Sequence, residues 1–256
     1  YQTFTAEKFL RWYQALPEVL RSRLIEPLVQ ELPVSHAYFS LDFKAKQFLR
    51  GAHAKVPYAH QAWLESFSEA ERQELLMPTY RAALPQHQYA RVDEYMQEMP
   101  GADPHLQATY FYLRTYMQDD ILAKVDRASM RVSLEVRAPL LDMRVVEMAM
   151  QMPWHFKYRG LTGKYILRKL MEDKLPQEIV WRGKHGFGLP IGEWFRGEWL
   201  PLLRDVLSEE GVRRAGICEP KVVMRLVDEH AAGTHNHRKK LWSLLILHLW
   251  YDHWIS

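Results

Sequence analysis

Cysteine is almost absent from this sequence: Cys218 is the single one among 256 residues, which excludes an internal disulfide. A chain without disulfides is typical of a reducing compartment, so we expect a cytoplasmic protein in which Cys218 is a small packing residue. Long apolar runs are also missing, since even Leu244–Leu247 is far shorter than the roughly 20 residues that cross a bilayer. The sequence therefore predicts no transmembrane helix and no membrane partner.

An excess of charge of either sign is missing as well. The 34 basic and 31 acidic residues leave a net charge of +3, too small for the whole chain to attract nucleic acid. The basic residues are concentrated between Lys157 and Lys184, where eight of them stand against three acidic residues. This segment has a local charge of +5 and the rest of the chain about −2, so any function that needs basic residues must be local.

Alternating runs of β-branched residues, which would predict strands, are nearly absent. Apolar residues instead recur at spacings of three and four along most of the chain, and this period predicts a mostly α protein. The first helix is expected over 6–15, with Phe9, Tyr13 and Leu16 on its buried face. The same buried stripe is expected to continue through Leu20, Leu24 and Leu28.

Four helix starts carry side chains that can accept hydrogen bonds from the free amides of a first turn. Thr5 precedes the helix expected over 6–15. Ser68 and Glu71 have the spacing of a capping box, while Asp103 and Asp142 each precede a helical pattern. The helix that follows Asp103 is expected to continue to residue 132 and, from its length, to be central and well covered. Further helices are expected near 40–52, 163–174, 190–207, 220–232 and 237–253.

Lys164 stands at an unusual place for a cation. It follows a glycine turn and opens a helical pattern, and the helix macrodipole disfavours a positive charge there by a few tenths of a kcal/mol to about 1. A phosphate ligand would satisfy both the ammonium and the free amides of the first turn. The alternative is a solvated lysine after a glycine turn, and the segment lacks the full Walker spacing.

Glu135 and Arg137 lie two residues apart in a segment that reads as extended, so their side chains project to the same side. Apolar neighbours flank them, and we expect a partly buried ion pair. Such a pair could line a pocket for an amino-acid substrate. It could equally fix the turn before Asp142, since breaking a buried pair costs roughly 3–5 kcal/mol whether or not it touches a ligand.

Three histidines, His230, His235 and His237, lie close together near the end of the chain. No nearby cysteine completes a zinc site, and Gly233, Thr234 and Asn236 read as an exposed turn. The sequence therefore predicts no metal site.

One segment, Asp120–Asp142, resembles the signature of the glutamine-hydrolysing asparagine synthetase family, particularly its bacterial members. Later blocks follow in the family's order: Gly163–Arg168, Leu175–Pro176, and Arg182–Phe187 with Pro190 and Trp194. Residues 1–100 are similar more loosely, through Ala59–Trp63, the helix start at Phe67 and Ser68, and Tyr1 as the end of a Gly-Gly-Tyr block. Ordered blocks over about 75 residues make a chance match very unlikely.

The resemblance implies that residues 1–256 form one helical region, the C-terminal part of an adenine-nucleotide α-hydrolase-like (PP-loop) synthetase domain without its parallel sheet. The family's glutaminase domain, with its nucleophilic cysteine, and its Ser-Gly-Gly-x-Asp-Ser loop for ATP pyrophosphate do not occur in the sequence. The chain opens at Tyr1 with no initiator Met and no leader. We therefore expect a fragment of a longer protein.

The family's reaction, as the resemblance implies it, activates the side-chain carboxylate of aspartate with Mg-ATP to an acyl-adenylate, which ammonia from glutamine converts to the amide. Lys164 matches the family lysine that stabilises charge on the leaving pyrophosphate. Asp126, Arg127, Glu135 and Arg137 match motif positions and are expected to bind substrate. ATP and Mg are expected as cofactors of the full-length protein, with none tightly bound to this chain, which by itself is expected to be inactive.

Other functions remain open at this point. Members of the family also act on other carboxylates, including those forming a β-lactam ring and precursors of cell-surface polysaccharides. A basic helical nucleic-acid binder would use the 157–184 cluster, and salt-dependent DNA binding would favour it; a helical interaction domain would need no site. On the synthetase hypothesis no nucleic acid is expected as a partner. Without a sheet to cover them, apolar helix faces predict a homo-oligomer.

Overall fold

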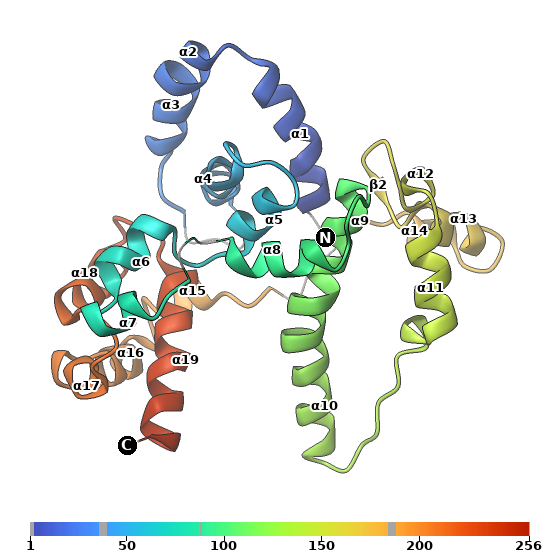
Figure 1. Ribbon diagram of the computed structural model, residues 1–256. Helices are drawn as coiled ribbons and strands as arrows, with labels where there is room; N and C mark the ends of the chain where they lie inside the picture. Colours follow the sequence, from blue (N-terminus) through green and yellow to red (C-terminus); the bar gives the residue numbers. More distant parts are fainter. Residues whose placement is uncertain (1–2, 36–39, 86, 88, 184–187, 256) are drawn as a thin grey trace. The chain divides into compact units, whose positions relative to one another are not determined.

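The computed structural model describes residues 3–35, 40–85, 87, 89–183 and 188–255 (Figure 1). Nearly all of their regular structure is helical. The strands form one antiparallel pair, β1 (Tyr158–Arg159) and β2 (Thr162–Gly163). The predicted mostly α fold is confirmed. No helix within the described ranges is long and apolar enough to cross a membrane.

The chain divides into two compact units, although the sequence contains no linker that marks a boundary. Unit 1 joins the two ends of the chain, Tyr1–Ala90 and Phe187–Ser256, and unit 2 is Arg91–Gly186 between them. A unit formed by both ends of a chain depends on contacts between residues far apart in sequence. Periodicity cannot predict such contacts.

The regular elements that the structure describes in unit 1 are all helices. Its N-terminal half contains α1 (Thr3–Ala15), α2 (Glu18–Leu20), the π-helical η1 (Arg21–Ile25), α3 (Glu26–Gln30), α4 (Leu41–Gly51), α5 (Tyr58–Leu64), α6 (Glu69–Leu75) and α7 (Pro78–Ala82). Its C-terminal half contains α15 (Ile191–Trp194), α16 (Leu200–Val206), α17 (Glu209–Ala215), α18 (Pro220–Ala231) and α19 (Arg238–Trp254). The single helix expected over 190–207 is two helices, and α17 was not predicted.

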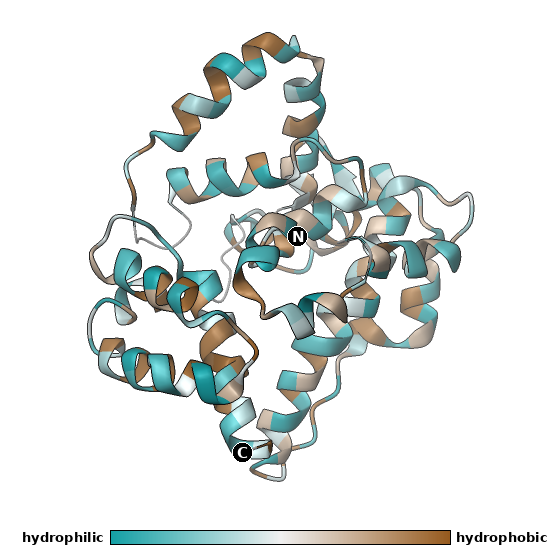
Figure 2. Ribbon diagram, turned by 60° about the vertical axis from the view of Figure 1, so that its left-hand side comes forward, coloured by the Kyte–Doolittle hydropathy of each residue, from teal (hydrophilic) through white to brown (hydrophobic). Residues whose placement is uncertain are grey.

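Unit 2 contains the hairpin and the remaining helices. These are α8 (Ala90–Gln97), which starts at the boundary, α9 (Pro104–Tyr112), the π-helical η2 (Leu113–Leu122), α10 (Ala123–Met130), the 3-10 turn η3 (Pro139–Leu141), α11 (Met143–Gln151), α12 (Trp154–Lys157), α13 (Tyr165–Met171) and α14 (Gln177–Val180). Hydrophobic residues form stripes along the helices, as an amphipathic pattern predicts (Figure 2).

The larger core of unit 1 lies among α16, α17, α18 and α19, with Phe195 and Leu203 fully buried in it. Backbone hydrogen bonds join this core to the end of α6, since the Glu219 amide donates to the Leu75 carbonyl at 2.7 Å. Cys218 is buried in the same cluster, and burial raises the pKa of its thiol to about 12. Its predicted packing role is confirmed.

The predicted buried face of the first helix is confirmed at Tyr13 but is wrong at Phe9 and Leu16. α1 begins at Thr3 and buries Phe4, Glu7, Leu10 and Tyr13, whereas Phe9 is 44% exposed. The predicted continuation of the stripe is also exposed, at Leu16, Leu20, Leu24 and Leu28. An apolar stripe predicts that a helix has a face to bury, but which residues are covered depends on the elements that pack against it.

Three of the four predicted caps are confirmed, those at Ser68, Asp103 and Asp142, whereas Thr5 lies inside α1 and starts no helix. The Ser68 hydroxyl accepts from the Glu71 amide at 3.3 Å while the Glu71 carboxylate accepts from the Ser68 amide at 2.7 Å, which completes the capping box. Asp103 accepts from the amide of His105 at 2.9 Å and Asp142 from that of Arg144 at 3.0 Å. Such bonds span two or three residues, so the sequence is sufficient to predict them.

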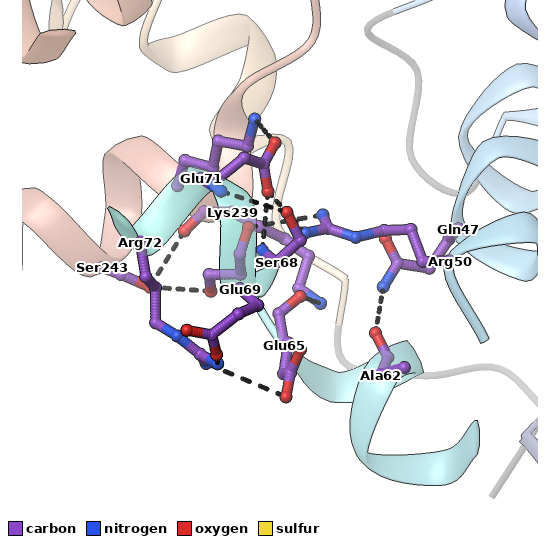
Figure 3. Close-up of polar contacts among 12 residues, drawn as sticks. Gln47, Arg50, Ala62, Glu65, Ser68, Glu69, Glu71, Arg72, Lys239 and Ser243 are labelled. Atoms are coloured by element: carbon purple, nitrogen blue, oxygen red, sulfur yellow. Dashed lines mark hydrogen bonds and ion pairs between the residues drawn. The ribbon is translucent and has the colours of Figure 1, made fainter. Parts of the chain in front are cut away.

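Glu71 also links three elements of unit 1 (Figure 3). Its carboxylate accepts from Arg50 on α4 at 2.7 Å and from Lys240 on α19 at 2.6 Å. Beside it, the Lys239 ammonium donates to the carbonyls of Leu64 and Glu65, each at 3.0 Å, at the end of α5. Burial lowers the pKa of Lys239 to about 8. Lys239 and Lys240, which are neighbours on α19, thus stabilise the connection between α5 and α6.

The long helix expected from 104 to 132 forms, as α9, η2 and α10 in succession, but its predicted coverage is wrong. Phe111 and Tyr112 are buried, whereas Leu122, Val125 and Met130 are exposed. Burial along this helix is therefore concentrated in its first part, α9. Its second half exposes the segment that resembles the family signature.

The end of α10 places Ser133 in the left-handed region, with φ 57°. The Leu134 amide donates to the Ser129 carbonyl at 3.0 Å, as in a Schellman motif, where glycine is the usual left-handed residue. Ser133→Gly is expected to raise the free energy of unfolding by about 1 kcal/mol, because glycine has no Cβ penalty there. Urea denaturation checks this, with Ser133→Ala as the control that keeps the Cβ. Equal stability of the two variants would contradict the assigned geometry.

Candidate functional site

Lys164 lies at the junction between the hairpin and α13. In the hairpin Tyr158 pairs with Gly163, and Gly160 makes the turn with φ +60°. Lys164 follows directly with φ 56° and ψ 35°, a left-handed conformation that costs a non-glycine residue about 1–2 kcal/mol. Such an outlier persists only where the surrounding structure holds it, and it is a reason to look for function.

The Lys164 side chain is exposed and makes no hydrogen bond or ion pair with any residue that the structure describes. It caps a helix of seven residues and has basic neighbours along the sequence. An exposed ammonium without a carboxylate partner is available to an anion.

Several other basic residues of the 157–184 cluster have structural partners within unit 2. Arg159 donates to the Tyr165 hydroxyl at 2.9 Å, and Lys169 pairs with Glu172 at 2.9 Å. Arg168 donates to the carbonyls of Gly163 and Val180, which joins the hairpin to the end of α14. Burial lowers the pKa of Lys157, the half-buried first member. Lys184 and the rest of its block, His185, Gly186 and Phe187, lie outside the described residues.

Asp126 and Arg127 project from α10 into solvent. Neither side chain has a hydrogen-bond or ion-pair partner among the described residues. A carboxylate and a guanidinium side by side on an exposed helix can bind the amino and carboxylate groups of an amino acid.

Glu135 and Arg137 form the predicted ion pair, but its predicted burial is wrong. Their side chains are 66% and 86% exposed, and the neighbouring Leu134 and Val136 are exposed as well. The segment between α10 and η3 is extended and has no described element packed over it. An exposed pair of this kind contributes at most about 1 kcal/mol, so it does not fix the turn before Asp142.

All five sequence-predicted site residues therefore lie in unit 2 and are exposed, on three separate segments. The described contacts do not join Lys164 to any of the other four. A shallow open hollow on α11, lined by Arg144, Glu147, Met148, Gln151 and Met152, includes none of them. The arrangement is a set of exposed polar groups on one unit rather than a formed pocket.

In unit 1, the three neighbouring histidines His230, His235 and His237 do not gather as a set. His230 is fully buried and uses both ring nitrogens inside the protein, whereas His235 and His237 meet Glu229 instead. The sequence analysis missed Glu229. The signal that could have found it is the spacing Glu-x5-His-x-His with a glycine between, because a left-handed turn after a helix reverses the chain direction.

Comparison with known proteins identifies relatives along nearly the whole chain. The asparagine synthase family model matches residues 2–252. The putative asparagine synthetase [glutamine-hydrolyzing] of Mycobacterium bovis is 32% identical over 244 residues, which are 94% of this chain and 35% of the relative.

Two relatives from other organisms match over fewer residues. Asparagine synthetase [glutamine-hydrolyzing] 1 of Bacillus subtilis is 33% identical over 143 residues, 56% of this chain and 22% of the relative. The Gallus gallus asparagine synthetase [glutamine-hydrolyzing] is 28% identical over 119 residues, 45% of this chain and 21% of the relative.

The chain thus spans about a third of the length of the mycobacterial relative. No solved structure matches it significantly. The family match and the ordered motifs of the sequence agree, and the chain belongs to the asparagine synthase family.

Proposed function

We propose that this chain is part of a cytoplasmic ligase that makes an amide from a carboxylate, ATP and glutamine-derived ammonia. A carboxylate oxygen attacks the α-phosphorus of ATP, the bond to the β-phosphate bridging oxygen breaks, and pyrophosphate leaves. Ammonia then attacks the acyl carbon of the adenylate and AMP leaves. Family membership and the names of the relatives support this reaction, with the aspartate side chain as the carboxylate and asparagine as the product.

The observation that carries the proposal is the position of Lys164, exposed and held in a left-handed conformation at the hairpin corner. In the proposed reaction its ammonium stabilises the negative charge that develops on the leaving pyrophosphate. A lysine bound by a carboxylate would first have to break that pair. Lys164 has no such pair within the described residues, so its charge is available without a rearrangement.

Asp126, Arg127, Glu135 and Arg137 are proposed to bind the substrate. The Arg127 guanidinium suits a carboxylate and the Asp126 carboxylate suits an ammonium, which are the two groups of an amino acid away from its side chain. Glu135 and Arg137 neutralise each other, and they can exchange their mutual contact for contacts with a charged substrate.

Magnesium would enter with ATP and be held mainly by the phosphates and carboxylate oxygens. The metal-ligating group that the described residues bring together, Glu229 with His235 and His237, is two-thirds imidazole and does not suit magnesium. We assign no magnesium ligand to this chain and no step to the ion.

A related carboxylate, such as a precursor of a cell-surface polysaccharide, is the alternative substrate, because the motifs of this chain do not separate the two. A nucleic-acid-binding function has less support. Arg159, Arg168 and Lys169 are engaged within unit 2 and would have to leave their partners to contact a phosphodiester backbone.

The test uses the complete protein that carries this chain. Carboxylate-dependent exchange of labelled pyrophosphate into ATP is expected with aspartate, because adenylate formation is reversible while pyrophosphate is present. The 256-residue chain alone is expected to give no exchange. A panel of other carboxylates identifies the alternative substrate, and absence of exchange with every member would contradict the proposal.

A further inference from the structure

The turn after α18 has a geometry that brings distant side chains together. Gly233 is left-handed, with φ +78°, and its amide donates to the His230 carbonyl at 3.1 Å. The amides of Thr234 and His235 donate back to the Glu229 carbonyl at 3.1 and 3.3 Å. The turn thus reverses the chain so that residues after the helix return to its last turn.

Another side chain at residue 233 would disturb this turn. The positive φ disfavours other residues there. A Cβ would also lie 2.8 Å from an Arg196 guanidinium nitrogen, but that side chain is flexible and can move away. The left-handed backbone at Gly233 is therefore what defines the turn between the two helices.

Three metal-ligating side chains meet at this turn. The His237 Nε2 lies 2.6 Å from Glu229 Oε2, and the His235 Nδ1 lies 3.8 Å from the same oxygen. The two imidazoles are stacked, with ring centroids 5.3 Å apart and planes 3° from parallel. All three ligand atoms lie within 4.8 Å of one another.

His230 holds His237 in place rather than joining the group. Its Nε2 lies 3.0 Å from the Gly192 carbonyl and its Nδ1 accepts the His237 amide at 3.1 Å. A carbonyl can only accept, so Nε2 carries the proton and Nδ1 is the acceptor. Both nitrogens are occupied, and the ring is 0% exposed.

The three side chains are buried in the protein on the side of His237 and open to solvent on the side of His235. His237 is 9% exposed, whereas the His235 side chain is 59% exposed. The Nε of Arg225 lies 3.9 Å from the second carboxylate oxygen, Oε1, and helps to orient Oε2 toward the rings. Lys240, the nearby cation on α19, is paired with Glu71 at 2.6 Å. Solvent can supply a further ligand from the side of His235.

We propose that Glu229, His235 and His237 bind one zinc ion, a site independent of the synthetase reaction. Two imidazoles and one carboxylate, with an open position for water, are a common zinc ligand set. Zinc–ligand bonds of about 2.1 Å in a tetrahedron place ligand atoms roughly 3.4 Å apart. The present separations from Glu229 Oε2, 2.6 and 3.8 Å, bracket that value, and the two imidazole nitrogens lie within 4.8 Å of each other, so side-chain movements alone can bring the three atoms to it. The ion would tie the last turn of α18 to the first residues of α19.

Direct binding measurements test the site. Calorimetric titration of the metal-free chain with zinc is expected to give one tight site per chain, and cobalt in its place a visible spectrum typical of four-coordinate geometry. His235→Asn removes an exposed ligand without touching the core and is expected to weaken binding by at least about 10-fold, since even the loss of an outer-shell partner costs about 10–100-fold. Glu229→Gln is expected to do the same.

The matched control is His53→Asn. His53 is another exposed histidine of unit 1 next to a carboxylate, 3.4 Å from Glu26, but among the described residues it belongs to no group of three metal-ligating side chains. Zinc binding should be unchanged in this variant, and zinc should raise the melting temperature of the wild type and of His53→Asn but not of His235→Asn. Circular dichroism verifies that each variant is folded. Equal zinc affinity of the His235 and His53 variants, or no stoichiometric site in the wild type, would overturn the proposal and leave a His237–Glu229 hydrogen bond that only stabilises the turn.

Discussion

Replacing Lys164 by glycine in the complete protein is expected to lower the rate of carboxylate-dependent ATP–pyrophosphate exchange by about 10²–10³-fold. Loss of one preorganised charge contact to a transition state costs about 2.7–4 kcal/mol, which corresponds to that factor. Glycine suits this test better than alanine because the backbone at residue 164 is left-handed. Lys164→Ala removes the same charge but keeps the Cβ penalty, so a difference between the two variants measures the backbone contribution.

Lys169→Ala is the matched control for Lys164. It removes a lysine of α13, the helix that Lys164 precedes, and this lysine is exposed like Lys164 but is paired with Glu172. Its effect on exchange should be less than about twofold, as for surface substitutions in general. Glutamine hydrolysis should continue in all three variants, since the proposal gives Lys164 no part in it. Exchange within twofold of the wild type in Lys164→Gly would exclude the phosphate assignment.

Replacing Glu71 by glutamine is expected to lower the free energy of unfolding by about 2 kcal/mol at neutral pH, because hydrogen bonds to a charged group are worth about 1.5–3 kcal/mol each and the site is partly exposed. The substitution leaves Arg50 and Lys240 without their shared carboxylate. Their side chains are only 25% and 16% exposed, so water compensates incompletely. Urea denaturation followed by circular dichroism measures the difference.

The difference in unfolding free energy between wild type and Glu71→Gln should disappear in acid. Burial by itself raises the pKa of Glu71. The hydrogen bonds from Lys240 and Ser68 and the charge of Arg50 outweigh burial and lower this pKa from 4.5 to about 2. The charged carboxylate is favoured in the folded state, so its contribution is fully present above pH 4.5 and decreases as the pH falls toward 2. The stability difference between wild type and Glu71→Gln should therefore narrow over that range.

Glu74→Gln is the control for Glu71. It removes a charge from the same helix and from an ion pair with Arg225, but both side chains are about half exposed, 51% and 49%. Solvent screens such a pair, so the loss of stability should be clearly smaller than for Glu71→Gln. Equal losses in the two variants would show that Glu71 acts only as one more surface charge.

Glu71 also illustrates how far sequence reasoning reaches. Its capping box with Ser68 is predictable, because both hydrogen bonds lie within three residues. Its bonds to Arg50 and Lys240 join residues 21 and 169 positions away, and nothing in the sequence marks them. The same contrast separates the confirmed caps at Asp103 and Asp142 from the wrong predictions of burial.

The errors in burial have one physical cause. Periodicity correctly predicts that the stretches around Leu20 and Val125 are helical, but burial requires a second surface, and these residues have none among the described elements. The Glu135–Arg137 pair forms because two residues of an extended segment face the same way. It is exposed because no described element covers that segment.

The sequence by itself determined the helical class, the capped helix starts, the glycine turn before Lys164 and, through ordered motifs, the family. These features depend on backbone preferences and on contacts between residues a few positions apart. Only the tertiary structure decided that the two ends of the chain fold as one unit, that Lys239 and Glu71 join α19 to α5 and α6, and that Glu229 meets two histidines. Those arrangements depend on side chains that pack or pair across long separations, where the gain from burial and charge pairing must exceed the entropy lost in closing the loop between them.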